Sequence, residues 1–238
     1  MLAEFVEKIA EMARVKTFDI NGSTYSSEPL ELVERAEERP HYYSVSTLES
    51  IVQLIRAEIA DIDSVAILVH AVEHDLVKVD TTYLSDYSRN ELYIARADIP
   101  GFNEGWRERE CAIIELRSLF IPSEGTEYLL SLLSRISNDS SVTTSDNGVT
   151  QKVEAKQGIA LNVVETVRPR VSLRPFRTFL EVDQPESEYL IRVDPEKGIG
   201  FFEADGGVWK LEAKRNIAAY FKEKLADLIE AGKVVVLT

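Results

Sequence analysis

A pair of short apolar strands constrains this chain more than any other feature. Residues 65–72 and 76–81 are rich in valine, alanine and leucine, and the polar run Glu73-His74-Asp75 separates them. A connection of three residues joins neighbouring strands only in the antiparallel sense. Ser46-Thr-Leu-Glu49 has the form of a capping box, and apolar residues follow it at helical spacing as far as Ile59. We therefore expect a helix lying on a small antiparallel sheet.

The rest of the first 140 residues continues this mixture of helices and strands. An Asn21-Gly22 pair between β-prone residues is typical of a hairpin. Alternating apolar residues predict a third strand that ends before Pro100. Helical spacing predicts helices over residues 2–12, 106–120 and 127–136, with a break at Pro122 and Gly125, and residues 27–40 read as a covering helix or a loop.

A polar stretch at residues 137–148 has the composition of a loop and is the expected domain boundary. The chain beyond it is rich in β-prone residues and predicts strands over 149–156, 159–167, 171–182, 189–193 and 199–203. An amphipathic helix around residues 217–228 and an apolar strand at 234–237 follow. The sequence predicts an α+β protein with an acidic α+β region at 1–140 and a β-rich region with a C-terminal helix at 141–238. The two regions could also form one integrated domain.

The charge of the chain is strongly uneven. Residues 151–238 carry 14 basic and 14 acidic side chains, so the whole net charge of −14 falls on residues 1–150. An acidic surface of this kind repels nucleic acid at long range, and we expect no direct binding of duplex DNA. A single cysteine and the lack of an apolar run of membrane-spanning length favour a cytoplasmic protein without membrane contact.

Specific strings in the last third resemble a known family. They are Leu173-Arg-Pro-Phe-Arg-Thr-Phe179, Glu181-Val-Asp-Gln-Pro-Glu186 and Phe202-Glu-Ala-Asp-Gly-Gly207. Their order is similar to that in the YfdQ-like family, a domain of unknown function carried by bacteriophages and prophages. The resemblance implies a phage accessory protein in the cytoplasm of a bacterial host. It implies no chemistry, no cofactor and no catalytic residue.

Four arginines form the most suggestive candidate site. Arg168, Arg170, Arg174 and Arg177 occur in a stretch without acidic residues, from 167 to 180, close to Phe176 and Phe179. Arginine binds phosphate and carboxylate through a planar fork, and aromatic rings can stack a base. The spacing predicts Arg168 and Arg170 on one side of a strand. These arginines could instead pair with acidic side chains of the first half, or contribute to a subunit interface.

A second candidate is the pair Glu203 and Asp205 beside the glycines at 206 and 207. Two carboxylates next to a flexible turn can hold a divalent cation or perform acid–base chemistry, although Asp-Gly-Gly is also typical of a simple tight turn. No metal site is expected from His70 and His74, because a zinc site needs three or four ligands. The common motifs of nucleotide hydrolysis, dinucleotide redox chemistry, serine hydrolysis and zinc proteolysis are missing from the sequence.

These features favour a binding protein over an enzyme. The leading hypothesis is phage counter-defence, either by sequestering a phosphorylated nucleotide signal or by blocking a host protein. One alternative is an enzyme acting on nucleotides through Glu203, Asp205 and a divalent metal. Another is an accessory factor in phage DNA replication or recombination that acts through protein partners. We also expect a homo-oligomer, because the strand at 234–237 and the arginine strip could serve an interface.

Overall fold

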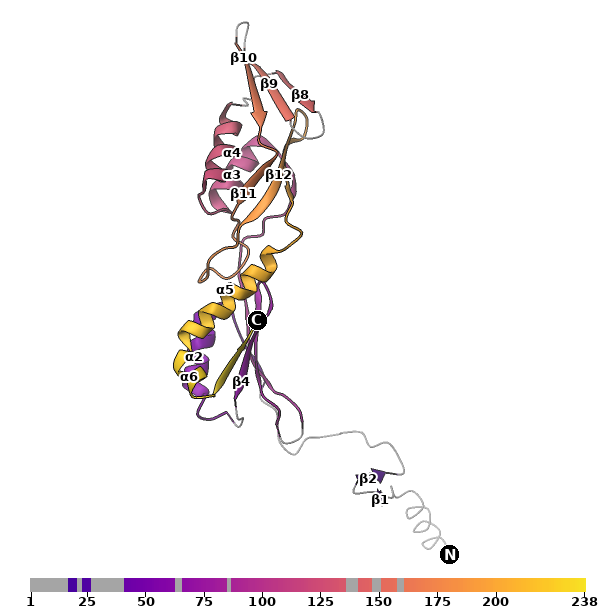
Figure 1. The fold of residues 1–238 in the computed structure, drawn as a ribbon, viewed down its shortest axis with the longest axis vertical. Helices are drawn as coiled ribbons and strands as arrows, with labels where there is room; N and C mark the ends of the chain where they lie inside the picture. Colours follow the sequence, from indigo (N-terminus) through magenta and orange to yellow (C-terminus); the bar gives the residue numbers. More distant parts are fainter. Residues whose placement is uncertain are drawn as a thin grey trace, which may run out of the picture. The chain divides into compact units, whose positions relative to one another are not determined.

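The structure is a computed structural model, and it describes residues 17–20, 23–26, 41–62, 66–84, 87–135, 141–146, 151–157 and 161–238. The chain divides into two compact units, residues 1–39 and residues 40–238. The larger unit has the expected α+β architecture, in which helices pack on mostly antiparallel sheets (Figure 1). None of the helices in the described residues is long and apolar enough to span a membrane.

A five-stranded sheet contains the expected hairpin at its centre. Its order is β14-β4-β5-β6-β3, and the two edge strands run parallel to their neighbours while the central pairs are antiparallel. The strands are β3 (Tyr43–Val45), β4 (Ile67–Glu73), β5 (Leu76–Thr81), β6 (Glu91–Arg96) and β14 (Val234–Leu237). The polar turn predicted at residues 73–75 joins β4 to β5, so the prediction from the apolar pattern is confirmed.

Helices α2 (Leu48–Glu58), α5 (Trp209–Lys224) and α6 (Ala226–Glu230) accompany this sheet. One face of α2 is buried together with alternate residues of β4 and β5 and with the apolar side of α5 in a first core. The helix begins one residue later than the capping box predicted, because Thr47 and not Ser46 accepts the hydrogen bond from the backbone N–H of Ser50, at 3.2 Å.

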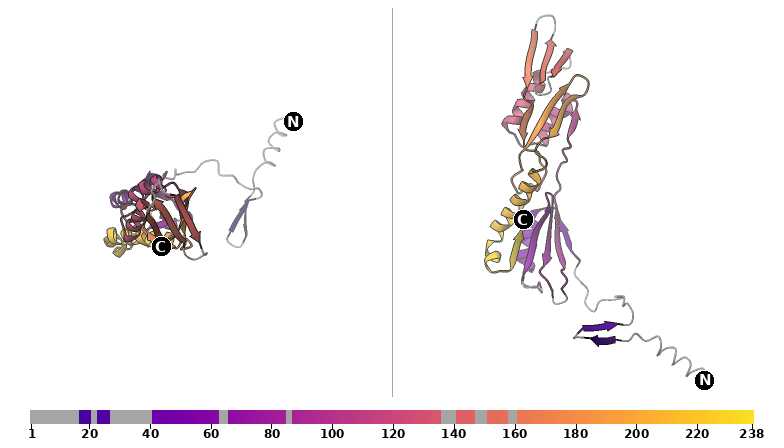
Figure 2. Two further views of the ribbon diagram at one scale, coloured as in Figure 1. Left: turned by 90° about the horizontal axis from the view of Figure 1, so that it is seen from above. Right: turned by 45° about the vertical axis from the view of Figure 1, so that its right-hand side comes forward.

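A four-stranded antiparallel sheet is the second large sheet of this unit, in the order β11-β12-β13-β7. Helices α3 and α4 pack on one of its faces around a second core (Figure 2). The elements are β7 (Gly105–Arg107), α3 (Arg109–Ser118), α4 (Glu124–Arg135), β11 (Arg170–Leu173), β12 (Ser187–Asp194) and β13 (Gly198–Glu203).

Two smaller sheets complete the described structure. Strands β8 (Ser141–Asp146), β9 (Gln151–Gln157) and β10 (Leu161–Val167) form an antiparallel sheet in that order. Strands β1 (Thr17–Ile20) and β2 (Ser23–Ser26) pair as an antiparallel hairpin, as the Asn-Gly pair between them predicted. The helix expected over residues 2–12 and the segment 27–40 lie outside the described residues.

Several expectations from the sequence are corrected. Trp106 lies in β7 and not in a helix, so the helix predicted from residue 106 begins at Arg109. Gly125 lies in the first turn of α4 and does not break it. The predicted strand 171–182 ends at Leu173. Residues 141–146, expected in a loop, form β8, and their valine and threonines are β-branched residues that favour strands.

The expected boundary between residues 140 and 141 is crossed by both large sheets. Strand β7 from the first region pairs with β13, and strand β14 from the second region pairs with β4. Residues 174–186, here called the linking segment, also connect the two cores. Phe179 of this segment is buried in the first core, whereas Leu173, just before the segment, is buried in the second. The hydroxyl of Thr178 donates a hydrogen bond to the carbonyl of His74 in the β4–β5 turn.

Candidate functional site

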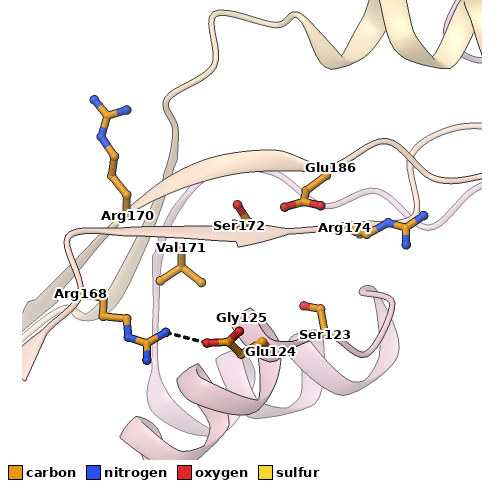
Figure 3. A pocket seen from close by; sticks show the side chains of 9 residues that line it. All are labelled: Ser123, Glu124, Gly125, Arg168, Arg170, Val171, Ser172, Arg174 and Glu186. Carbon is orange, nitrogen blue, oxygen red and sulfur yellow. Dashed lines mark hydrogen bonds and ion pairs between the residues drawn. The ribbon is translucent and has the colours of Figure 1, made fainter.

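A groove of about 460 Å³ follows the edge strand β11 and the N-terminal end of α4. Three of the four arginines singled out from the sequence line it, and we call it the anion groove (Figure 3). Its lining residues are Ser123, Glu124, Gly125, Arg168, Arg170, Val171, Ser172, Arg174 and Glu186.

Close packing of α4 against β11 forms the floor of this groove. A Cβ atom at Gly125 would lie 2.1 Å from the backbone oxygen of Ser172, so only glycine allows the helix to approach the strand so closely. Ser123 and Thr126 cap the helix reciprocally, since each side-chain oxygen accepts a hydrogen bond from the other residue's backbone N–H. The N-terminal end of a helix carries a partial positive charge, which adds to that of the arginines.

Two of the arginines hold exposed acidic partners. The Arg168 guanidinium lies 3.1 Å from Glu124, and the Arg170 guanidinium lies 2.8 Å from Glu188. Arg168 precedes β11 and does not lie in a strand, and Figure 3 shows its side chain and that of Arg170 pointing to opposite sides, so the expectation that the two share one side of a strand is wrong. All four side chains are more than half exposed. Exposed ion pairs contribute little, so an incoming anion could replace either carboxylate at small cost.

Arg174 is the arginine best placed to bind an anion. Its Nε donates a hydrogen bond to the backbone oxygen of Gln184 at 3.0 Å, which fixes the plane of the guanidinium. Among the described residues no carboxylate lies within ion-pair distance of it, although Glu186 lines the same groove. The side chain is half-buried, and its two terminal nitrogens remain available for a planar, two-oxygen ligand.

Arg177 is not part of the groove. Its side chain is 7% exposed and lies with its guanidinium carbon 3.8 Å from the centroid of the Trp209 ring. It forms an ion pair of 2.7 Å with Glu203 and donates hydrogen bonds to the hydroxyl of Ser187 and the carbonyl of Pro185. Burial lowers the pKa of Arg177, but a guanidinium stays charged at physiological pH. Its observed contacts are those of a structural arginine.

The two phenylalanines of the arginine strip also lie away from the groove. Phe179 is buried in the first core, and Phe176 is half-buried with its backbone N–H bonded to the carbonyl of Leu119 at 2.9 Å. Neither ring lines the anion groove. Arg168, Arg170 and Arg174 therefore line one groove, in which Figure 3 shows their guanidinium groups pointing in different directions, and the other residues of the strip lie outside it.

Glu203 and Asp205 both accept hydrogen bonds from the protein. Glu203 receives them from Arg177 and from the indole N–H of Trp209, the latter at 3.3 Å. Asp205 receives them from the hydroxyl of Ser187 and from the backbone N–H of Gly207, at 3.0 Å. The part of the chain that the structure describes contains no cluster of three or more groups able to hold a metal ion. In this structure both carboxylates hold the turn that leads from β13 into α5.

The sequence did not point to Ser123, Gly125 or Glu186 as groove residues. A serine directly after Pro122, followed by Glu124 and Glu127, is a usual helix start, and it could have placed the N-terminal end of α4 correctly. The contact between the N-terminal end of α4 and β11, which follows more than 40 residues later in the chain, depends on tertiary packing. Comparisons with protein-family models, curated proteins and solved structures found no match for this chain.

Proposed function

We propose that this protein acts by binding and that the anion groove takes a phosphorylated small molecule. The observation that carries the proposal is Arg174, a guanidinium with a fixed plane, free terminal nitrogens and no carboxylate partner among the described residues. Arg168 and Arg170 line the same groove, the carboxylates that they pair with are exposed, and the N-terminal end of α4 adds further positive charge. Phosphate suits this set of donors because arginine binds it through two parallel hydrogen bonds.

The biological setting of the proposal comes from the resemblance to phage proteins. A phage accessory protein that binds a phosphorylated nucleotide in the bacterial cytoplasm would lower the concentration of a host defence signal. The second form of the proposal, in which the protein blocks a host protein, would use the acidic surface of residues 1–150. A homo-oligomer is compatible with either form, and light scattering measures it directly.

The first experiment is denaturing extraction of the purified protein, followed by mass spectrometry of the released small molecules and by calorimetric titration with a panel of cyclic and linear nucleotides. Arg174→Ala removes a charge-assisted contact of about 1.5–3 kcal/mol, so we expect affinity to fall roughly 10- to 100-fold. Arg215→Ala, on the exposed side of α5, is the matched control and should bind as the wild type does.

Two results would refute small-molecule binding at this groove. One is an empty extract together with no heat of binding across the nucleotide panel. The other is a nucleotide that binds equally well to the Arg174→Ala and wild-type proteins. Either result would leave the host-protein form of the proposal, which affinity purification from the bacterial host then tests.

A further inference from the structure

The four-stranded sheet has a second face, opposite to α3 and α4. Strand register places Arg170, Leu190 and Phe202 in one row across this face, and Arg192, Gly200 and Trp106 in the next row. The residues with the opposite side-chain direction, such as Ile191 and Phe201, belong to the second core. Among the described residues, the helices in extensive contact with this sheet are α3 and α4, whose contacts lie in the second core on the opposite face.

Two aromatic rings meet on this face above a glycine. The rings of Trp106 and Phe202 are 5.8 Å apart between centroids and stand at 78° to one another. A Cβ atom at Gly200 would lie 2.7 Å from the Phe202 ring and 3.1 Å from that of Trp106, so both rings lean over the bare backbone. Trp106 is 36% exposed, a large fraction for an indole. We call Trp106, Phe202 and Gly200 the aromatic platform.

Basic groups lie at the border of this platform. The Lys197 ammonium, in the turn between β12 and β13, is 5.6 Å from the centroid of the Trp106 ring. Arg170 lies in the same row as Phe202 but two strands away, which corresponds to about 10 Å. Its partner Glu188 is exposed and weakly held. The face thus offers cations on both sides of the exposed Trp106 ring and the half-buried Phe202 ring.

We propose that the aromatic platform binds single-stranded nucleic acid. Bases stack on exposed aromatic rings while nearby cations contact the phosphates, and such platforms accept many sequences. The distance between the rings and Arg170 suits several linked nucleotides better than one. A duplex is a poor ligand because its bases are stacked inside the helix, and the net charge of −14 makes binding weak.

This inference does not depend on the proposed function. Arg170 borders both sites, but the residues that distinguish the two sites differ. Arg174 lines the anion groove, whereas Trp106, Phe202 and Lys197 do not. Trp106→Ala should therefore leave binding of nucleotides to the groove unchanged, and Arg174→Ala should leave binding of oligonucleotides to the platform unchanged. The failure of one proposal is thus distinguishable from the failure of the other.

The test is a titration of the full chain with fluorescently labelled twelve-residue oligo(dT) and oligo(U) in about 20 mM salt, followed by anisotropy and by intrinsic tryptophan fluorescence. The chain has two tryptophans, and Trp209 is buried at 6% exposure, so quenching reports mainly on Trp106. We expect quenching in the wild type and affinity at least fivefold weaker in Trp106→Ala and in Phe202→Ala. Tyr87→Ala is the matched control, an exposed aromatic residue of the β5–β6 connection.

Lys197→Ala provides a variant whose fold is not at risk, because this side chain is exposed in a turn. It should weaken oligonucleotide binding and lower the slope of log affinity against log salt by about one. The proposal is overturned if neither oligonucleotide binds at 100-fold molar excess over the protein. It is also overturned if Lys197→Ala and a folded Trp106→Ala protein, checked by circular dichroism, both bind like the wild type.

Discussion

At the scale of single residues, burial decides what each arginine contributes. Arg170 and Arg177 both form ion pairs of similar length with a glutamate, but the first pair is exposed and the second is largely withdrawn from water. An exposed pair contributes roughly 0–1 kcal/mol, because water screens the charges and long side chains lose freedom. Removing one partner of a buried pair leaves the other charge uncompensated, which costs about 3–5 kcal/mol.

We therefore expect Arg177→Ala to lower the free energy of unfolding by about 3 kcal/mol, because Glu203 is partly exposed and recovers some hydration. Arg170→Ala, the matched control, should change it by less than 1 kcal/mol. Urea denaturation followed by circular dichroism measures both values. Similar losses in the two variants would contradict the assignment of Arg177 as a structural residue.

The candidate site was predictable from the sequence only in part. Three of the arginines in the cluster without acidic neighbours, Arg168, Arg170 and Arg174, line one groove. Spacing along the chain did not separate them from Arg177, because its partner Glu203 lies 26 residues further on and reaches it through the pairing of β12 with β13. Local sequence contains no information on such a distant contact.

At the scale of elements, one glycine controls how α4 meets β11. Alanine is a better helix former than glycine by about 1 kcal/mol, so Gly125→Ala would stabilise a free helix. In this protein the new Cβ would lie 2.1 Å from the Ser172 oxygen and 2.8 Å from a methyl carbon of Val171. The backbone oxygen belongs to a strand paired with β12 and cannot move aside easily. Overpacking of this kind costs about 1–3 kcal/mol, so the clash outweighs the gain in helix propensity.

Gly125→Ala should accordingly destabilise the protein and displace α4 from the anion groove, so that nucleotide affinity falls as well. Thermal unfolding and the calorimetric titration measure the two effects. Gly101→Ala is the control, because nothing lies within 4 Å of a Cβ atom at that loop position. An increase in stability in Gly125→Ala would show that the helix and the strand are not in close contact.

The elements with strong periodicity were predictable, and those determined by tertiary contacts were not. The helix α2, the β4–β5 hairpin and the strand β14 follow from apolar spacing and from polar turns. The edge strand β3 has three residues, and each pairs with a residue of β6 that lies 50 positions further on. Trp106 fits the helical spacing of the residues after it, but pairing with Gly200 draws it into β7.

At the scale of the whole larger unit, the linking segment ties the two cores together. Gln184 stabilises the shape of this segment. Its side-chain oxygen accepts hydrogen bonds from the backbone N–H groups of Arg177 and Thr178, and its side-chain NH2 donates one to the carbonyl of Phe179. The carboxylate of Glu181 accepts a hydrogen bond of 2.8 Å from the backbone N–H of Leu48, so it caps α2 although it lies 133 residues further along the chain. These contacts predict that the two cores unfold as one.

Phe179→Ala tests this coupling, because the ring is buried in the first core while the segment begins at the second. We expect a loss of about 3–5 kcal/mol in the free energy of unfolding. Phe176→Ala, a half-buried ring of the same segment, should cost less. Trp106→Phe leaves Trp209 at the start of α5, and Trp209→Phe leaves Trp106 in β7 of the four-stranded sheet. In urea both reporters should show the same midpoint, and Phe179→Ala should lower the two midpoints together. Two separate midpoints in the otherwise wild-type background would mean that each core unfolds alone and that the linking segment only connects them.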